Sequence, residues 1–253
     1  MQIIKTLKKQ MLKMAFESQH GHVASSFSCI DILYVLYNNI MDVTPDNYED
    51  NNSDRFILSK GHACLALYVI LEQKGFITKE DLSTFCKSGT VLSGHPNKNI
   101  PGVICNTGSL GHGLGIATGI ALSKKIKGNS GNVYCLLGDE ESMEGTTFEC
   151  MTLINNYNLD NLYIIIDQNS SAPVNLRSLA QKFEVFGLYV KNIIGHNHYD
   201  LKNILSLKIS KPKCLIACNT KGNGIKRMEE DSQAWHHRKF NKKEYYEMLE
   251  ELS

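Results

Sequence analysis

Long apolar runs, proline and net charge are all scarce in this chain of 253 residues. A membrane-spanning helix needs about 20 consecutive apolar residues, and no run in the sequence approaches that length. The formal net charge of +1 gives no electrostatic field that would attract nucleic acid or an anionic membrane surface. We therefore expect neither nucleic acid nor a membrane among the partners. With 42% apolar and 21% charged residues, the composition is that of a globular protein.

Paired cysteine motifs are also missing. The eight cysteines include no C-x-x-C pair, and most of them lie inside apolar runs, which disfavours both a disulfide framework and a zinc site. The first fourteen residues intersperse lysine among apolar residues and lack the continuous apolar core of a secretory signal. These features predict a cytoplasmic protein in a reducing compartment.

Helical and strand patterns alternate along the chain. Apolar residues at helical spacing predict helices over Ile3–Phe16, Ile30–Ile40, Ala63–Gln73, Lys79–Cys86, Leu110–Lys127, Glu144–Asn156, Ser178–Phe186, Tyr199–Ile209 and Asn241–Glu250. Short apolar runs predict strands over Arg55–Ser59, Val133–Leu137, Leu162–Asp167, Tyr189–Ile193 and Cys214–Asn219. Such strands, alternating with helices, are typical of an α/β fold with a parallel sheet covered by helices on both faces. With five prolines and no Ser/Gly-rich linker, residues 1–253 are predicted to form a single domain.

Two polar side chains come just after neighbouring predicted strands. Asp139 follows the strand at Val133–Leu137, and Asn169 follows the strand at Leu162–Asp167. Ligands of parallel α/β sheets bind beyond the carboxyl ends of the strands. A carboxylate and an amide oxygen suit Mg²⁺ that keeps water and takes phosphate oxygens as its other ligands. Their spacing leaves equally open that Asp139 and Asn169 only cap the following helix and turn.

The segment around these two residues resembles a known family. Residues 138–169 read GDEESMEGTTFECMTLINNYNLDNLYIIIDQN, which is similar to the thiamine-diphosphate motif, Gly-Asp-Gly followed later by Asn. The Glu-Gly after the motif and the L-D-N-L before the strand resemble transketolase. Further blocks agree with transketolase in order, namely Gly21-His22, Ser28 to Tyr37, Asp54 to Ala63, Gly94-His95-Pro96, Pro101 to Gly113, Lys211 to Gly224 and Trp235-His236. The resemblance covers nearly the whole chain.

The resemblance implies the cofactors thiamine diphosphate and Mg²⁺, in the diphosphate-binding fold of the family, and a set of site residues. The residues implied to bind the cofactor are His62, Gly108, Leu110, Asp139, Glu140, Asn169 and His236. Those implied to bind Mg²⁺ are Asp139, Asn169 and, through its backbone carbonyl, Ser171. The implied catalytic residues are His22, His95 and Glu144. His22 and His95 would face the substrate, and Glu144 would pair with a glutamate across an interface.

The family binds thiamine diphosphate between two domains, and this chain resembles only the one that holds the diphosphate and Mg²⁺. The other domain carries the glutamate that protonates the aminopyrimidine ring, and the residues after Trp235 are too few to supply it. The family includes versions in which the two halves are separate chains. The resemblance therefore implies an N-terminal transketolase subunit that is active only with a C-terminal partner subunit, in a two-plus-two assembly.

The implied reaction transfers a two-carbon ketol unit from a ketose, as a sugar or sugar phosphate, to an aldose. Two alternatives stay open: a subunit of another thiamine-diphosphate enzyme, such as a 2-oxo-acid decarboxylase or dehydrogenase component, or a non-catalytic module that keeps the fold. The Gly-His pairs at 21–22, 61–62 and 94–95 favour transketolase. Glu140 stands in place of the glycine that is the motif's third residue, and it favours the non-catalytic module. His198 and His237 match no block and are expected to be solvated.

Overall fold

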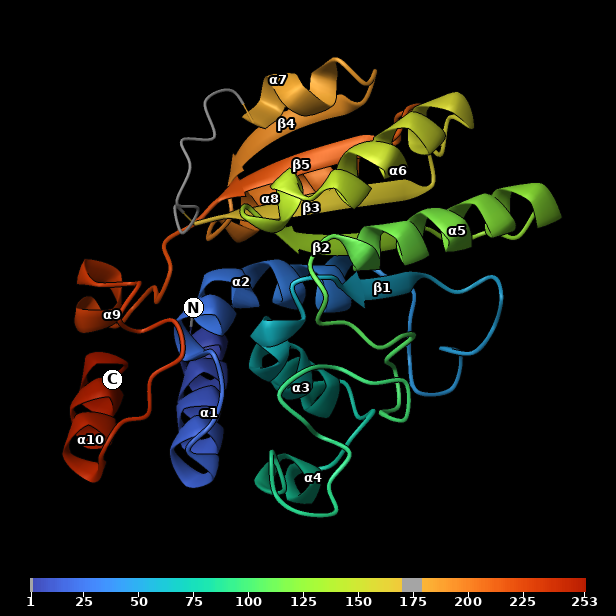
Figure 1. The fold of residues 1–253 in the computed structure, drawn as a ribbon. Helices are drawn as coiled ribbons and strands as arrows, with labels where there is room; N and C mark the ends of the chain where they lie inside the picture. Colours follow the sequence, from blue (N-terminus) through green and yellow to red (C-terminus); the bar gives the residue numbers. More distant parts are fainter. Residues whose placement is uncertain (1, 170–178) are drawn as a thin grey trace.

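Five parallel strands form one sheet in the order β1-β2-β3-β5-β4 (Figure 1). The computed structural model describes residues 2–169 and 179–253. The strands are β1 (Arg55–Leu58), β2 (Val133–Gly138), β3 (Leu162–Gln168), β4 (Tyr189–Ile194) and β5 (Lys213–Cys218). The predicted α/β fold with a parallel sheet is confirmed, and each strand lies close to its predicted bounds.

Helices cover both faces of the sheet because successive strand side chains point to opposite sides. In β3, Ile164 and Ile166 belong to one buried apolar cluster and Tyr163 and Ile165 to the other. The first cluster includes residues from α5 (His112–Lys127), α6 (Gly145–Asn156) and α7 (Leu179–Glu184). The second includes residues from α1 (Gln2–Ser18), α2 (Val23–Val35), α3 (Cys64–Gln73), α4 (Lys79–Ser83), α8 (His198–Leu205), α9 (Lys226–Glu230) and α10 (Lys242–Glu251).

Helix α2 differs most from its prediction, because it begins at Val23 rather than Ile30 and ends in a π-helical turn, Leu36–Ile40. Its residues are buried almost all round, including Ser25, Ser26 and Ser28. A helix buried on every side has no amphipathic pattern, and serines are weak helix formers. Periodicity therefore could not show where this helix begins.

Smaller differences concern short helices. Helix α9 was not predicted, since it is a single turn whose one buried residue is Met228. Helix α4 ends at Ser83 and α8 at Leu205, both before their predicted ends.

All eight cysteines carry free thiols. Within residues 2–169 and 179–253, we find no helix with the length and apolar character needed to cross a membrane.

Candidate active site

A narrow polar cavity lies where β1, β2, β3 and β5 reach their carboxyl ends, the predicted place for a ligand. It encloses about 20 Å³ and is lined by Ser25, Lys60, His62, Leu110, Gly138, Asp139, Glu140, Glu141, Asn169, Lys221 and His236. Six of the residues predicted from the sequence are among them. The structure thus brings together His62, Leu110, Asp139, Glu140, Asn169 and His236.

Asp139 and Asn169 are in direct contact across neighbouring strands. The backbone N–H of Asn169 donates to Asp139 Oδ2 at 3.2 Å, and that of Glu140 donates to Oδ1 at 3.0 Å. Both Asp139 and Asn169 are buried. Parallel pairing of β2 with β3 places the two loops at the same edge of the sheet. Asp139 and Asn169 thereby line the same cavity.

A buried ion pair contacts the side chain of Asn169. Lys60 donates to Asp167 Oδ2, and the two side chains are 2% and 0% exposed. The Asn169 amide nitrogen donates to the same Asp167 oxygen at 3.2 Å and to Ser28 Oγ at 3.0 Å. Burial is the largest single influence on the pKa of Lys60 and lowers it, but the charge and hydrogen bond of Asp167, together with smaller contributions from Cys29 and Asp139, raise that pKa overall, so Lys60 is protonated. These contacts fix the plane of the Asn169 amide.

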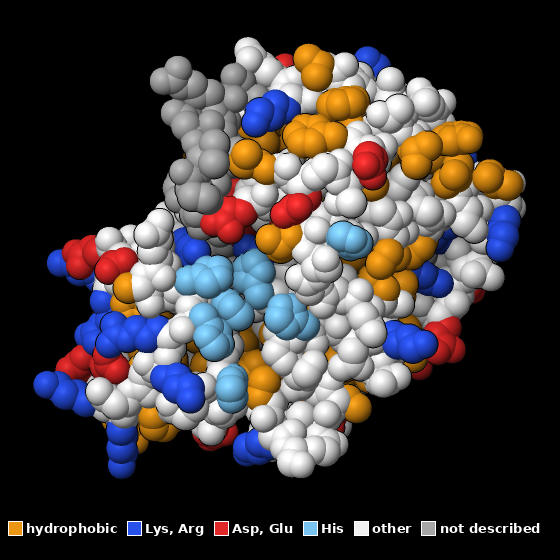
Figure 2. All heavy atoms as spheres, viewed as in Figure 1, with side chains coloured by type: hydrophobic (Ala, Val, Ile, Leu, Met, Phe, Trp, Pro, Cys, Tyr) orange, Lys and Arg blue, Asp and Glu red, His pale blue; other side chains and the backbone are white. Residues whose placement is uncertain are grey.

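Four imidazoles gather beside the cavity and form a pale-blue patch on the surface in Figure 2. The His22 ring lies 5.2 Å from His62, 5.0 Å from His236 and 4.6 Å from His237, between ring centroids. His22 precedes α2, His62 follows β1, and His236 and His237 lie between α9 and α10. Segments far apart in the sequence therefore converge on His22.

The loops that carry His62 and His95 pack against the loop at Gly108. A Cβ atom at Gly108 would lie 3.2 Å from His95 Cδ2. A Cβ atom at Gly61 would lie 2.8 Å from Thr107 Oγ1 and 3.1 Å from the backbone nitrogen of Gly108. Such distances leave no room for larger residues. Gly61 and Gly108 thus allow the close approach of the three loops, which places His95 near the other imidazoles.

Burial keeps the imidazoles of His22, His62, His95 and His236 neutral at pH 7. It is the main cause that lowers the pKa of His22 to about 3 and of His62 to about 2, with smaller contributions from neighbouring positive groups. Burial also lowers the pKa of His95 and His236. His22 and His95 were predicted to face the substrate, where an imidazole with an ordinary pKa can carry protons near pH 7. In this structure His22 serves as a neutral hydrogen-bonding group unless bound negative charge raises its pKa.

These shifts predict an acid-labile fold. The pKa of His22 is about 3 in the folded chain and about 6.5 in an unfolded one. Between these values the unfolded chain binds more protons, so the free energy of unfolding falls as the pH falls. We expect His22→Asn, which places a residue favoured at helix N-caps where His22 makes no side-chain capping hydrogen bond, to show a shallower fall in the free energy of urea unfolding between pH 6.5 and pH 4. If the free energy of unfolding fell equally steeply with pH in the two proteins, His22 would not be neutral in the folded chain, contrary to our description.

Lys221 faces the cavity together with Glu140. Its Nζ donates to His236 Nδ1 at 3.1 Å, so the proton of the neutral His236 ring resides on Nε2. Burial lowers the pKa of Lys221, and so does the Lys60 charge, whereas Glu140 raises it. Glu140 itself is exposed, and its backbone N–H is engaged by Asp139. The cavity therefore has both a cationic and an anionic side chain at its edge.

One predicted residue lies apart from both the cavity and the imidazoles. Glu144 precedes α6 and is exposed, and its Cβ lies 2.8 Å from the position that a Cβ of Gly111 would take. It therefore stands at the junction of α5 and α6, on the surface. Ser171 lies outside the described residues.

Several site residues were missed from the sequence or placed wrongly. Lys60 and Asp167 were predicted only as parts of a motif block and a strand, although a charge inside an apolar strand usually has a buried partner. His237 is exposed, as expected, but also packs on His22. The prediction that His198 is solvated holds only in part, because its side chain is 34% exposed but has partners. Its Nε2 lies 2.6 Å from Asp31 Oδ1, and its ring stacks on Tyr34.

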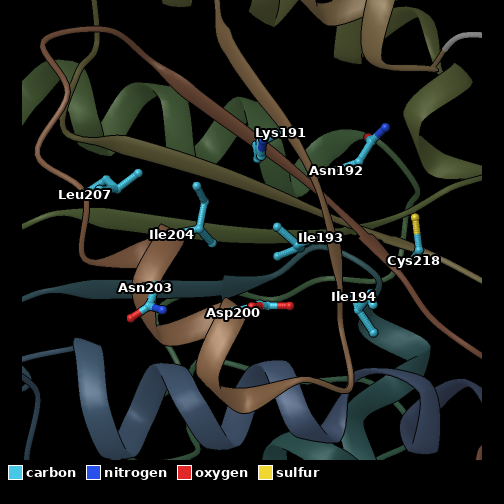
Figure 3. A pocket seen from close by; sticks show the side chains of 9 residues that line it. All are labelled: Lys191, Asn192, Ile193, Ile194, Asp200, Asn203, Ile204, Leu207 and Cys218. Atoms are coloured by element: carbon cyan, nitrogen blue, oxygen red, sulfur yellow. The ribbon is translucent and has the colours of Figure 1, made fainter.

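Larger cavities lie away from the narrow polar cavity and its neighbouring imidazoles. One of 720 Å³ borders α1 and α8 and is lined by Lys8, Asp31, His196 and His198 among others. Another, of 520 Å³, lies between β4 and α8 (Figure 3). Ile193, Ile204 and Leu207 give the second a mainly apolar lining. Neither is lined by any of the residues predicted to bind the cofactor, whereas six of them line the narrow polar cavity, so we place the candidate site there.

Comparison with known proteins shows the family to which the chain belongs. The family model described as transketolase, thiamine diphosphate binding domain, matches residues 1–244. The chain belongs to this transketolase family. The resemblance deduced from the motifs is thus confirmed, including its restriction to the thiamine-diphosphate-binding domain.

Relatives in the transketolase family are of two lengths. An apulose-4-phosphate transketolase subunit from Phocaeicola vulgatus is 37% identical, with 97% of this chain and 91% of that protein aligned. The corresponding subunit from Actinobacillus succinogenes is 35% identical over 92% and 87% of the two chains. Human transketolase is 33% identical over 92% of this chain, which spans only 38% of it. The solved transketolase from Campylobacter jejuni superposes with a TM-score of 0.91 at 28% identity, covering 99% of this chain and 42% of that one.

Proposed function

We propose that this chain is the diphosphate-binding, N-terminal subunit of a two-chain transketolase, which moves a two-carbon ketol unit from a ketose phosphate to an aldose. The observation that carries the proposal is the convergence of Asp139, Asn169, His62 and His236 on one polar cavity. Support also comes from the two relatives named as subunits of apulose-4-phosphate transketolase, which match along most of their length. The proposal assigns residues 1–253 to a single domain and places the protein in the cytoplasm.

The residues around the cavity fit Mg²⁺ and thiamine diphosphate in their chemistry. Asp139 and Asn169 offer hard oxygen ligands of the kind Mg²⁺ prefers alongside phosphate oxygens. Ser171 would add its carbonyl. Lys221, His62 and the Nε2–H of His236 are nitrogen donors suited to phosphate oxygens. With about 20 Å³ between these groups, the flexible ends of Lys221 and Glu140 must turn aside to admit the diphosphate.

Each predicted residue has a role in this proposal. Bound thiamine diphosphate supplies the carbon nucleophile that cleaves the ketose. His62 and His236 hold the diphosphate, while the backbone at Gly108, Leu110 and Glu140 lies alongside it. His22 and His95 hydrogen-bond the substrate hydroxyls from the imidazole cluster.

The surface position of Glu144 suits contact with a second chain. It is exposed where α5 and α6 begin, so a carboxyl group on a partner can approach it without displacing the core. We propose a C-terminal, pyrimidine-binding subunit as that partner, in a two-plus-two hetero-oligomer. Its glutamate would complete the cofactor site.

Glu140 is expected to hinder cofactor binding slightly. Its carboxylate borders the cavity and would face the diphosphate, a like charge. Its φ of −60° needs no glycine. We expect Glu140→Gly to bind Mg²⁺–thiamine diphosphate as tightly as the unmodified chain or more tightly, measured by calorimetry. Weakening by more than about tenfold, or 1.4 kcal/mol, would assign the glutamate a favourable role.

An assay of two reactions tests the proposed function against its alternatives. The chain, its partner subunit, Mg²⁺ and thiamine diphosphate are incubated with a ketose phosphate and an aldose, or with a 2-oxo acid. We expect ketol transfer and no release of CO₂ from the 2-oxo acid. Decarboxylation without transfer would favour the decarboxylase alternative, and neither reaction with cofactor bound would favour a non-catalytic module.

A further inference from the structure

A buried glutamate beside the cavity has no role in the proposed chemistry. Glu141 is only 1% exposed and lies in the short helical turn Glu141–Met143 after β2. Glu residues are almost never fully buried without partners. Burial raises the pKa of its carboxyl, and hydrogen bonds from Ser59 and from two backbone groups oppose this. The hydrogen-bond partners of this carboxylate therefore indicate its role.

Three separate segments donate hydrogen bonds to the Glu141 carboxylate. Ser59 Oγ and the backbone N–H of Gly111 donate to Oε1, the latter at 2.8 Å, and the backbone N–H of Gly138 donates to Oε2 at 3.1 Å. Each donor adjoins a predicted cofactor contact. Ser59 is three residues before His62, Gly111 follows Leu110, and Gly138 precedes Asp139.

Tight packing leaves these segments little freedom to find other partners. Gly111 has a φ of +81°, and a Cβ there would lie 2.3 Å from Thr146 Oγ1. A Cβ at Gly113 would lie 2.4 Å from Ser59 Oγ. The hydroxyl of Thr147 also donates to the Glu141 carbonyl at 3.1 Å, which fixes the turn itself. The start of α5, the end of β1 and the start of α6 are thus pressed together around the carboxylate.

We propose that Glu141 is a positioning residue that sets the spacing of the His62, Leu110 and Asp139 loops around the cofactor diphosphate. Two backbone N–H groups and a hydroxyl converge on it, and a carboxylate accepts from all three at once. This inference rests on the proposed function for its cofactor, but the arrangement of the loops is a property of the chain alone.

The test compares Glu141→Gln with a second buried carboxylate that joins loops far from the site. A glutamine presents its NH₂ group to at least one of the donors, so one backbone hydrogen bond is lost. Asp54 is a suitable control because it is 6% exposed and accepts from the backbone N–H groups of Asp42 at 2.8 Å and Asn132 at 2.6 Å. It lies at the amino end of β1, the opposite edge of the sheet.

We expect both Glu141→Gln and Asp54→Asn to lower the midpoint of urea unfolding. Only Glu141→Gln should weaken binding of Mg²⁺–thiamine diphosphate to the full chain with its partner subunit, by about tenfold or more in calorimetry. Amide hydrogen exchange at Gly111 and Gly138 should quicken in Glu141→Gln and stay unchanged in Asp54→Asn.

Two results would overturn the inference. One is an unchanged cofactor affinity in Glu141→Gln, and the other is unchanged exchange at Gly111 and Gly138. If the unmodified protein bound no cofactor, the proposed function would fail instead. The exchange measurement needs no cofactor, so it would still decide whether Glu141 holds the loops.

Discussion

Replacing Asp139 with Ala is expected to abolish the Mg²⁺-dependent part of thiamine diphosphate binding. Asp139 is the one carboxylate we assign to the metal, it is buried, and it also accepts the backbone N–H of Asn169. Its removal therefore takes away a charged ligand and loosens a second one. We expect the affinity measured by calorimetry in the presence of Mg²⁺ to fall by at least about a hundredfold, equal to about 2.8 kcal/mol.

Asp160→Ala is the matched control for this experiment. Asp160 lies just before β3, at the opposite end of the sheet, and its side chain is 40% exposed in an ion pair with Lys125. The Asp160→Ala variant should bind the cofactor as tightly as the unmodified chain does. Equal affinity in Asp139→Ala and the unmodified chain, with both folded by circular dichroism, would show that the metal assignment is wrong.

A second large effect is expected from Lys60→Met, this time on stability. The substitution keeps most of the side-chain volume but leaves Asp167 as a buried carboxylate without its cation. Asp167 would retain the Asn219 amide, which donates at 2.6 Å, and its other polar neighbours. Removing one partner of a buried ion pair costs about 3–5 kcal/mol, which urea unfolding would detect as a lower midpoint.

Lys125→Met supplies the comparison, because Lys125 and Asp160 are 38% and 40% exposed. A surface ion pair contributes about 0–1 kcal/mol, so this variant should unfold almost like the unmodified chain. Similar losses in Lys60→Met and Lys125→Met would mean that the buried contact between Lys60 and Asp167 stabilises the fold no more than a surface ion pair does, contrary to our account of the site.

The fold could be predicted because its strands are short apolar runs separated by amphipathic or glycine-rich helices. Burial on both faces makes β2 and residues Leu162–Ile166 of β3 apolar, and this pattern does not depend on where the neighbouring helices begin or end. The beginning of α2 could not be predicted for the same physical reason. Its burial on all sides removes the contrast between faces on which periodicity depends.

The candidate site was predictable where its residues follow strands or belong to a family motif. Asp139 and Asn169 come just after β2 and β3, and parallel strands place both loops at one edge of the sheet. Glu141 and Lys60 were not predicted as site residues because their partners are distant in sequence. Ser59, Gly111 and Asp167 reach them only through the tertiary fold.

The most direct test of the account measures ketol transfer by the pure 253-residue chain, with and without a C-terminal partner subunit. In the proposed division of roles, this chain holds the diphosphate and Mg²⁺, while a partner glutamate must protonate the aminopyrimidine ring. We expect no transfer from a ketose phosphate to an aldose when only the chain, thiamine diphosphate and Mg²⁺ are present. Adding the partner should give full activity and a particle whose mass in solution fits two copies of each subunit. Full turnover by the chain alone would contradict the two-chain account.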